Sequence, residues 1–364
     1  MKAVVIERPH RVDWVELETP TAGPGEVVVR SHVAGVCRTD LEMLHGSLTD
    51  PRWVRFPLVP GHEWSGTVAE LGDGVTELEL GDRVVCEGMI PCNRCRQCKS
   101  GDTQLCVNYD QIGFTRGGGY GEYVRVPRHV VHRLPDAVSY AAGALVEPAS
   151  CVLRGLERTR PRPGDTVGVI GIGTLGSLAL GLARLYSPGA LVAYGVRTEE
   201  LEFAASLGAG ARVHVGEQDA VAETNAVAGG GLDLVIETAG APEAVDLATR
   251  LVRPGGRVVL LGIAGEGRTL ELPSDRIMFA DMEVIGTCSY PTSAWSRVVT
   301  LLEHGLVDFD PIVTHRFPTV QFEEAFAVLD ERRGTVAKVL LEHVPELAPP
   351  PHVRPPAEAT ETRA

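Results

Sequence analysis

Between residues 153 and 289, short apolar segments alternate with segments of helical length. Val167–Ile170, Leu191–Tyr194, Asp233–Ile236 and Arg257–Leu261 are short and apolar, as expected of buried strands. Strands that alternate with helices form a parallel sheet with helices on both faces, because each connection has to cross back to the other end of the sheet. The sequence therefore predicts an α/β, doubly wound parallel-sheet domain over this part of the chain.

A glycine-rich turn follows the first of these strands and opens a helix. Its residues are Gly171, Ile172, Gly173, Thr174, Leu175 and Gly176. A G-x-G-x-x-G string is weak evidence alone, and it also occurs in buried helix hairpins, but the strand–helix alternation around it favours a dinucleotide-binding loop. The first glycine permits the tight turn, the second admits a pyrophosphate, and the third lets helix and strand pack closely. The helix N-terminus attracts the phosphate charge.

The end of the second strand bears on which dinucleotide is bound. An acidic residue there would hold the ribose 2′-hydroxyl of NAD, whereas a small residue followed by an arginine suits the 2′-phosphate of NADP. Here Gly195 ends the strand and Arg197 follows it. Arg197 could also be an ordinary surface charge, and Glu199 and Glu200 would repel a phosphate. The pattern favours NADP modestly over NAD.

The first 152 residues have a different texture. Short strand-like runs such as Glu26–Arg30, Gly66–Glu70 and Asp82–Val85 are separated by turns rich in glycine and proline, which predicts a β-rich domain. We expect residues 290–343 to complete that domain. Residues 345–364 carry six prolines and few large apolar side chains, which is typical of a disordered tail.

Four of the eight cysteines lie within fifteen residues of one another. They are Cys92, Cys95, Cys98 and Cys106. Zinc takes four thiolates in a tetrahedron, and a Cys-x2-Cys spacing lets two sulfurs reach one ion. An iron–sulfur cluster is the alternative, but the bacterial ferredoxin pattern continues with a cysteine after three residues and a proline, and this chain does not. The spacing predicts a structural zinc, whose filled coordination shell excludes it from the chemistry.

Further residues of metal-ligating type are scattered through the first domain. Cys37, His62, Glu63 and Glu147 each have an ordinary interpretation, as core residues or as an acid at the start of a helix. Their spacing alone does not unite them into a site.

At this point the chain resembles the zinc-dependent medium-chain alcohol dehydrogenases, and within them the polyol and threonine dehydrogenases. Gly61-His62-Glu63-x2-Gly66-x5-Gly72-x2-Val75 matches the zinc signature of that family at every fixed position. The resemblance extends over nearly all of residues 1–343 and includes the cysteine loop and the nucleotide loop in the family's order. It implies a GroES-like β-rich catalytic domain, a Rossmann domain and a cleft between them.

The resemblance also implies a second, catalytic zinc. It places the ligands at Cys37, His62 and either Glu63 or Glu147, and it gives Thr39 the role of relaying the proton from the alcohol. Asp40 resembles the acid that orients the ligand histidine. Many relatives carry a histidine where this chain has Glu42, so Glu42, His45 or solvent could complete the relay.

The remaining cofactor contacts are implied by the same resemblance. Arg38 is similar to an arginine that contacts the pyrophosphate in liver-type relatives. Two segments match those that line the nicotinamide half: Leu261, Gly262 and Ile263, and Thr287 with Cys288. Cys288 is equally consistent with a buried thiol.

These features predict an enzyme that transfers a hydride between a secondary alcohol, such as a polyol, sugar or cyclitol, and NAD(P), with two zinc ions per chain. An NADPH-dependent ketone or aldehyde reductase is an alternative. A non-catalytic relative is a second alternative, disfavoured because Cys37, Thr39, His62 and Glu147 are all present. The net charge of −14 argues against nucleic acid and anionic membranes as partners. We expect a cytoplasmic homodimer or homotetramer.

Overall fold

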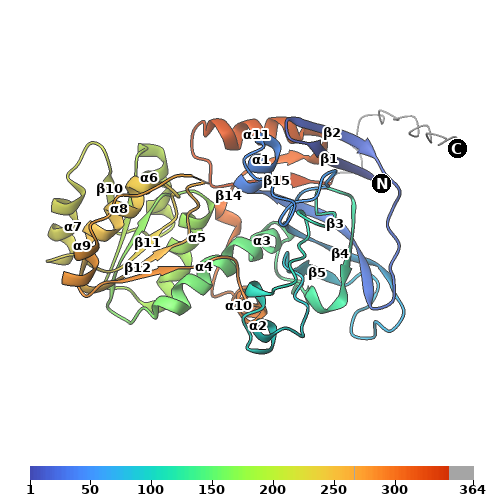
Figure 1. Cartoon of the computed structure of the whole chain (residues 1–364), viewed down its shortest axis with the longest axis horizontal. Helices are drawn as coiled ribbons and strands as arrows, with labels where there is room; N and C mark the ends of the chain where they lie inside the picture. Colours follow the sequence, from blue (N-terminus) through green and yellow to red (C-terminus); the bar gives the residue numbers. More distant parts are fainter. Residues whose placement is uncertain (266, 344–364) are drawn as a thin grey trace, which may run out of the picture.

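In the computed structural model, residues 1–265 and 267–343 are described, so the predicted tail over residues 345–364 lies outside the described residues. The described chain forms two lobes (Figure 1), one around a parallel sheet and one around an antiparallel sheet. None of its helices combines the length and the apolar character that crossing a membrane requires.

The first lobe contains a six-stranded sheet in the order β10-β9-β8-β11-β12-β13, and every neighbouring pair in it is parallel. Its strands are β8 (Thr166–Ile170), β9 (Ala190–Gly195), β10 (Ala211–His214), β11 (Leu232–Glu237), β12 (Val252–Leu260) and β13 (Glu283–Gly286). The chain order reverses beside β8, whose neighbours are β9 and β11. Doubly wound sheets bind their ligands at such a switch point. The predicted fold class is confirmed.

Helices connect these strands and cover the sheet. They are α5 (Thr174–Ala183), α6 (Thr198–Ser206), α7 (Ala220–Ala228), α8 (Pro242–Leu251) and α9 (Ser274–Phe279). A 3-10 turn, η3 (Arg184–Tyr186), extends α5. Leu178, Leu180 and Leu182 of α5 are completely buried, which presses the helix of the glycine-rich turn firmly onto the lobe's core.

The second lobe contains the antiparallel sheet β15-β3-β4-β5-β7, which β14 extends by a parallel pairing with β15 and to which β6 adds through β3. Its strands are β3 (Glu26–Val36), β4 (Glu63–Leu71), β5 (Arg83–Cys86), β6 (Tyr123–Pro127), β7 (Val131–Arg133), β14 (Val313–Pro318) and β15 (Lys338–Glu342). A separate hairpin joins β1 (Lys2–Arg8) and β2 (Arg11–Glu16). The last strand of the described chain therefore lies beside one of the first, because β15 pairs with β3.

Short helices surround this sheet and join the lobes. They are α1 (Arg38–His45), α2 (Arg96–Lys99), α3 (Tyr140–Ala144), α4 (Val146–Thr159), α10 (Thr292–Glu303) and α11 (Phe322–Glu331). The 3-10 turns are η1 (Thr103–Leu105), η2 (Arg128–Val130), η4 (Asp310–Ile312) and η5 (Thr319–Gln321). In Figure 1, α4 runs between the lobes, and the predicted boundary at residue 152 falls inside this one continuous helix.

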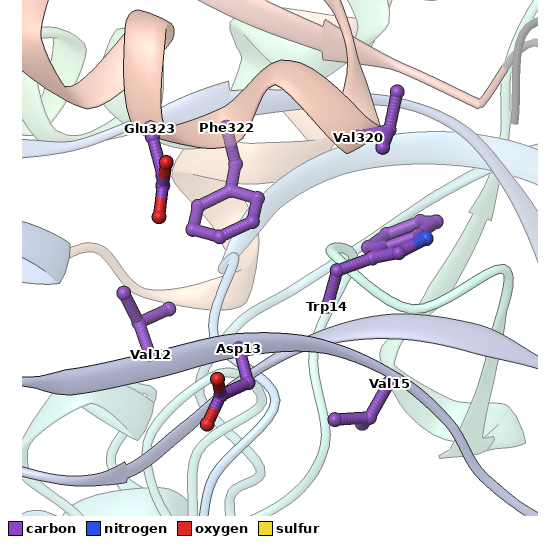
Figure 2. Close-up of a pocket in the computed structure, with 7 residues that line it drawn as sticks. All are labelled: Val12, Asp13, Trp14, Val15, Val320, Phe322 and Glu323. Carbon is purple, nitrogen blue, oxygen red and sulfur yellow. The ribbon is translucent and has the colours of Figure 1, made fainter. Parts of the chain in front are cut away.

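A surface pocket of about 400 Å³ lies between β2 and the start of α11 (Figure 2). Trp14 and Phe322 project into it from opposite sides, and Asp13 and Glu323 lie at its edge. Its lining includes none of the predicted site residues, so the candidate chemistry lies elsewhere.

Candidate active site

Cys37, His62 and Glu63 are brought together by the fold of the second lobe. One ligand atom from each residue lies within 4.8 Å of the other two, which is a spacing that one metal ion can span. His62 is 5% exposed and Glu63 2% exposed. The partly buried Cys37 and the two buried side chains around a common point form a candidate zinc site.

The two short segments that carry these residues are fixed by local structure. Cys37 caps α1, and its backbone N–H donates a 2.9 Å hydrogen bond to Asp40 Oδ2. Gly61, at φ 96°, turns the chain into β4 just before His62. A Cβ on Gly61 would lie 2.5 Å from the ring of Tyr120, so only glycine permits this close approach.

Asp40 and Tyr120 lie on the Nδ1 side of the His62 ring. Asp40 is completely buried, and its Oδ2 accepts a 2.7 Å hydrogen bond from the Tyr120 hydroxyl. The other carboxylate oxygen lies 3.7 Å from Nδ1 of His62. Burial works against a charged imidazole, but the Cys37 sulfur and Asp40 outweigh it and raise the pKa of His62 well above its ordinary value. Nε2 is therefore the nitrogen available to a metal, while Nδ1 faces Asp40.

Sequence reasoning missed Lys338, which is completely enclosed at this site. Its Nζ donates hydrogen bonds to Glu63 Oε2 and, at 3.0 Å, to the carbonyl of Val36. Burial favours the neutral amine, yet Glu63 and Cys37 outweigh it and raise the pKa of Lys338. The signal was a lysine directly before the apolar run Val339–Leu341, because a lysine buried in such a strand needs an anionic partner.

Glu147 lies close enough to the site to interact electrostatically, but it does not belong to the group whose atoms converge. Burial raises the pKa of Glu147 to about 7, and Glu63 adds to the rise while His62 and Lys338 oppose it. The residue is 8% exposed and lies in the first turn of α4. Of the two glutamates that the sequence left open, Glu63 is the one placed with Cys37 and His62.

Thr39 and Glu42 extend from this site along α1. The Thr39 hydroxyl donates a 3.2 Å hydrogen bond to Cys37 Sγ, which places it beside the candidate metal position. Glu42 is half-buried, and burial raises its pKa while Arg38 opposes the rise. His45 is exposed at the end of the helix, 4.0 Å from Asp330.

The sulfurs of the four-cysteine loop converge in the same way. They all lie within 4.8 Å of one another. Backbone N–H groups point at them: Cys92 N lies 3.3 Å from Cys106 Sγ, and Cys95 N lies 3.4 Å from Cys92 Sγ. Such N–H groups, first that of Arg94, lower the pKa of Cys92 to about 5, whereas burial raises the pKa of Cys98 to about 12. Thiolates this close together would repel one another, so the arrangement suits a bound cation such as zinc.

The glycine-rich turn has the geometry of a pyrophosphate cradle. Gly171 has φ 87°, and a Cβ on Gly176 would lie 1.9 Å from the Gly171 carbonyl oxygen. At Gly173, by contrast, a Cβ would meet no atom closer than 4.0 Å. The first and third glycines are thus required by packing, while the second faces open space. Of the other loop residues, Ile172 is buried, Leu175 packs against the core, and Thr174 Oγ1 donates to the carbonyl of Ala337.

The two residues assigned to the 2′-phosphate of NADP lie at the end of β9, as expected. Gly195 is the last residue of β9, and Arg197 caps the following helix. Arg197 Nη1 donates to the carbonyl of Arg332 and lies 3.9 Å from Glu200 Oε1. Arg38, expected at the pyrophosphate, is paired with Asp330 at 3.0 Å.

The segments assigned to the nicotinamide end lie beyond β12 and β13. Leu261 is buried, and Gly262 is pressed against Gly240, where a Cβ would lie 2.2 Å from a backbone nitrogen. Ile263 and Cys288 are exposed, so Cys288 is no buried thiol. Thr287 carries a buried hydroxyl without a hydrogen-bond partner in the described chain, which is a group that a bound ligand could satisfy.

The residues present therefore fit both groups that the fold implies. Asp40 Oδ1 and His62 Nδ1 are buried without a hydrogen bond in the described chain, as expected of a site that tightens around a metal. The space above Gly173 and the hydroxyl of Thr287 suit a dinucleotide.

Comparisons with known proteins show the family to which the chain belongs. Residues 23–136 match the alcohol dehydrogenase GroES-like domain, and residues 174–304 match the zinc-binding dehydrogenase family. The chain is 31% identical over 357 residues to an erythritol/L-threitol dehydrogenase of Mycolicibacterium smegmatis, which covers 94% of this chain and 97% of the relative.

Two solved structures have the same fold. A structure described as a zinc-binding dehydrogenase from Sinorhizobium meliloti bound to NADP has a TM-score of 0.86 and 32% identity, covering 94% of this chain and 98% of that one. An alcohol dehydrogenase from Escherichia coli CFT073 complexed with NADH has a TM-score of 0.87 and 27% identity, covering 94% and 99%. The chain is thus an oxidoreductase that acts on CH–OH groups, and it belongs to the zinc-dependent medium-chain alcohol dehydrogenase family, nearest its polyol and threonine dehydrogenases.

Proposed function

We propose that this enzyme oxidises a secondary alcohol of the polyol class with NADP as the preferred acceptor. The observation that carries the proposal is the convergence of Cys37, His62 and Glu63, with the Thr39 hydroxyl beside them. A polyol is favoured because the relatives named for their substrates include an erythritol/L-threitol and a sorbitol dehydrogenase.

Cys37, His62 and Glu63 would hold a catalytic zinc, and Glu147 would lie beside it. A zinc ion there would supply a Lewis acid that lowers the pKa of an alcohol hydroxyl. Asp40, whose Oδ1 lies 3.7 Å from Nδ1 of His62, would orient the His62 ring, and Lys338 would neutralise part of the negative charge of the ligand set. The four cysteines from Cys92 to Cys106 would hold a second, structural zinc.

Proton removal falls to side chains of α1. The Thr39 hydroxyl can accept the proton of the alcohol while it donates its own proton to the next group of the path. Glu42 is one turn further along the helix, and its half-buried carboxylate, of raised pKa, is suited to take that proton up and release it to water. His45 is one more turn along and is exposed. The proposed path therefore runs from Thr39 to Glu42 and then to solvent.

NADP is favoured because β9 ends in Gly195, which carries no acidic side chain to repel a phosphate, and Arg197 follows with a guanidinium. A planar guanidinium is well matched to a phosphate. Glu200, next to Arg197, is buried, and its pKa is raised by that burial although Arg332 and Arg197 oppose the rise. Burial thus disfavours the charged form of Glu200, which is the form that would repel a phosphate.

We also propose that the enzyme is a homodimer joined through β13. This strand is at the end of the parallel sheet, and its Val284 is 37% exposed. Met278 and Phe279 of the adjacent α9 are 61% and 79% exposed. An exposed edge strand beside large apolar side chains is a surface that a second copy can extend and cover. Light scattering should give twice the chain mass, and Val284→Lys should reduce it to one chain.

A substrate panel tests the main proposal. Polyols, simple secondary alcohols and L-threonine should be offered with NADP and with NAD to zinc-loaded enzyme, and the absorbance of the reduced cofactor followed. We expect the highest kcat/KM for a polyol with NADP. Cys37→Ala should abolish turnover while cofactor binding remains. Turnover by fully zinc-free protein would contradict the proposed chemistry, and a preference for NAD would contradict the assignment of Arg197.

A further inference from the structure

The last turn of α11 brings an arginine from the second lobe to the nucleotide loop of the first. Arg332 caps this helix in the left-handed conformation, with φ 49°, and its N–H donates a 3.1 Å hydrogen bond to the Val328 carbonyl. The left-handed residue ends the helix and redirects the chain. Arg332 therefore stands at the junction of the two lobes, although neither a family signature nor its spacing singles it out.

Side chains of the first lobe hold the backbone at and after Arg332 in place. Arg197 Nη1 donates to the carbonyl oxygen of Arg332. Five residues further on, the carbonyl of Ala337 accepts a hydrogen bond from Thr174 Oγ1, at the start of α5. Both donors belong to segments expected to surround the dinucleotide. The position of Arg332 is thus tied to the same loop that would hold the cofactor.

The side chain of Arg332 reaches over the second glycine of that loop. Its Nη2 lies 4.0 Å from the position that a Cβ on Gly173 would occupy, and among the described residues, the chain neighbours of Gly173 apart, no other atom comes as close. In dinucleotide-binding loops, the backbone at the second glycine is where the pyrophosphate makes its closest approach. The guanidinium therefore borders the space that a pyrophosphate would fill, beside the N-terminus of α5, whose N-cap is Gly173.

The side chain of Arg332 differs from the neighbouring arginine side chains, because it is not paired with an acidic residue. Arg38 is paired with Asp330, and Arg333 is paired with Glu331 at 2.5 Å. Across residues 1–265 and 267–343, by contrast, the Arg332 guanidinium makes no hydrogen bond or ion pair, although its charge acts on Glu200 and opposes the rise in the pKa of that carboxyl. An exposed guanidinium directed at a phosphate cradle has its donors available for an anion.

We propose that Arg332 binds the pyrophosphate of the dinucleotide, so that the second lobe contributes a charged contact to a site built mainly by the first. This inference rests on the proposed dinucleotide function but not on the preference for NADP, because NAD and NADP share the pyrophosphate. Arg332 is distinct in this respect from Arg197, whose proposed target is the 2′-phosphate. The contact would form only while the two lobes are together, which couples cofactor binding to their arrangement.

The test measures binding without turnover. Dissociation constants of NADH and NADPH should be measured by fluorescence on zinc-loaded enzyme for Arg332→Ala, Arg332→Lys and the neighbouring control Arg333→Ala. Loss of a charge-assisted pyrophosphate contact should weaken both cofactors by about 10-fold or more, and by the same factor. Arg332→Lys should lose less, and Arg333→Ala should stay within about twofold of wild type.

Three results would overturn the proposal. Unchanged dissociation constants in Arg332→Ala would show that the side chain makes no contact. Weakening of NADPH alone would assign the guanidinium to the 2′-phosphate. Equal losses in Arg332→Ala and Arg333→Ala would indicate a general charge effect. Failure of the proposed NADP preference would be distinguishable. The wild-type enzyme would then bind NADH as tightly as NADPH or more tightly, while Arg332→Ala would still weaken both cofactors by the same factor.

Discussion

The ammonium group of Lys338 donates a hydrogen bond to the carboxylate of Glu63, and both side chains are almost completely removed from water. Lys338 is in the last strand of the described chain, whereas Glu63 begins β4. The same lysine donates to the carbonyl of Val36, next to the candidate ligand Cys37. The pair therefore joins two strands and the candidate zinc site in one buried contact.

Lys338→Met should destabilise the enzyme strongly. The substitution leaves Glu63 as a buried carboxylate without its cation, and breaking a buried ion pair on one side typically costs about 3–5 kcal/mol. Thermal unfolding of the zinc-free protein, in which no metal ion compensates the Glu63 carboxylate, should show the loss. Lys338→Met combined with Glu63→Gln should recover part of it, because no unpaired charge remains. If Lys338→Met alone were as stable as wild type, the charge of Glu63 would be compensated by a group other than Lys338.

Tyr120→Phe should weaken zinc binding at the catalytic position while leaving the fold intact. The change removes the hydroxyl that donates to Asp40 and so releases the carboxylate that orients His62. Loss of such a supporting partner typically lowers metal affinity by about 10-fold or more. Competition with a chromophoric chelator measures the affinity directly. Tyr123→Phe, three residues away on β6, is the control, and an equal effect in both variants would refute a specific role for Tyr120.

The features that could be predicted from the sequence are those whose residues are adjacent in the chain. The cysteine loop and the glycine-rich turn each occupy fifteen residues or fewer, so their spacing already encodes their geometry. The same holds for the alternating strands and helices of the parallel sheet, since a period of apolar residues is a local property.

The residues that escaped prediction depend on contacts between distant segments. Lys338 and Glu63 are 275 positions apart, and Tyr120 reaches Asp40 across 80 positions. Only the pairing of β15 with β3 brings the end of the described chain back to the zinc site. Arg332 is a similar case, because its position over Gly173 follows from how the two lobes pack. The choice between Glu63 and Glu147 was open for the same reason.

The two proposed zinc ions should be separable by mutation. Wild-type enzyme should contain two zinc ions per chain by elemental analysis. Cys98→Ser should lose one of them and lower Tm by about 5 °C or more, because a structural zinc contributes directly to folding. Cys37→Ser should lose the other and all turnover with little change in Tm. Iron in place of zinc, or loss of both ions in either variant, would contradict two independent sites.

Stability should decline as the pH falls below about 6.5, in part because of His32 and His343. Burial and nearby arginines hold the pKa of His32 below its ordinary value of 6.5, and burial does the same for His343. The folded protein thus prefers both rings neutral. Above pH 6.5 both states carry neutral rings and the stability is full. At lower pH the unfolded chain binds protons that the folded one resists, so stability is lost.

Replacing both residues by glutamine should reduce this pH dependence. The fall in Tm between pH 7.5 and pH 5.5 should be smaller in His32→Gln/His343→Gln than in wild type. His10→Gln removes an exposed histidine and is the control. An unchanged slope in the double variant would assign the acid sensitivity to other groups.

Arg197→Ala should change the choice of cofactor. Arg197 is partly buried, with a side-chain exposure of 28%, and is held between the Arg332 carbonyl and Glu200 at the end of β9. If its guanidinium contacts the 2′-phosphate, its removal should weaken NADPH by about 10-fold or more, since a charge-assisted hydrogen bond contributes about 1.5–3 kcal/mol, whereas NADH lacks that phosphate and should bind almost as before. Glu200→Gln should have the opposite effect, because it removes a carboxylate that competes for the same guanidinium. Fluorescence titration of both reduced cofactors measures the ratio. Equal weakening of NADH and NADPH in Arg197→Ala would mean that the arginine supports the loop through Arg332 and does not read the 2′-phosphate.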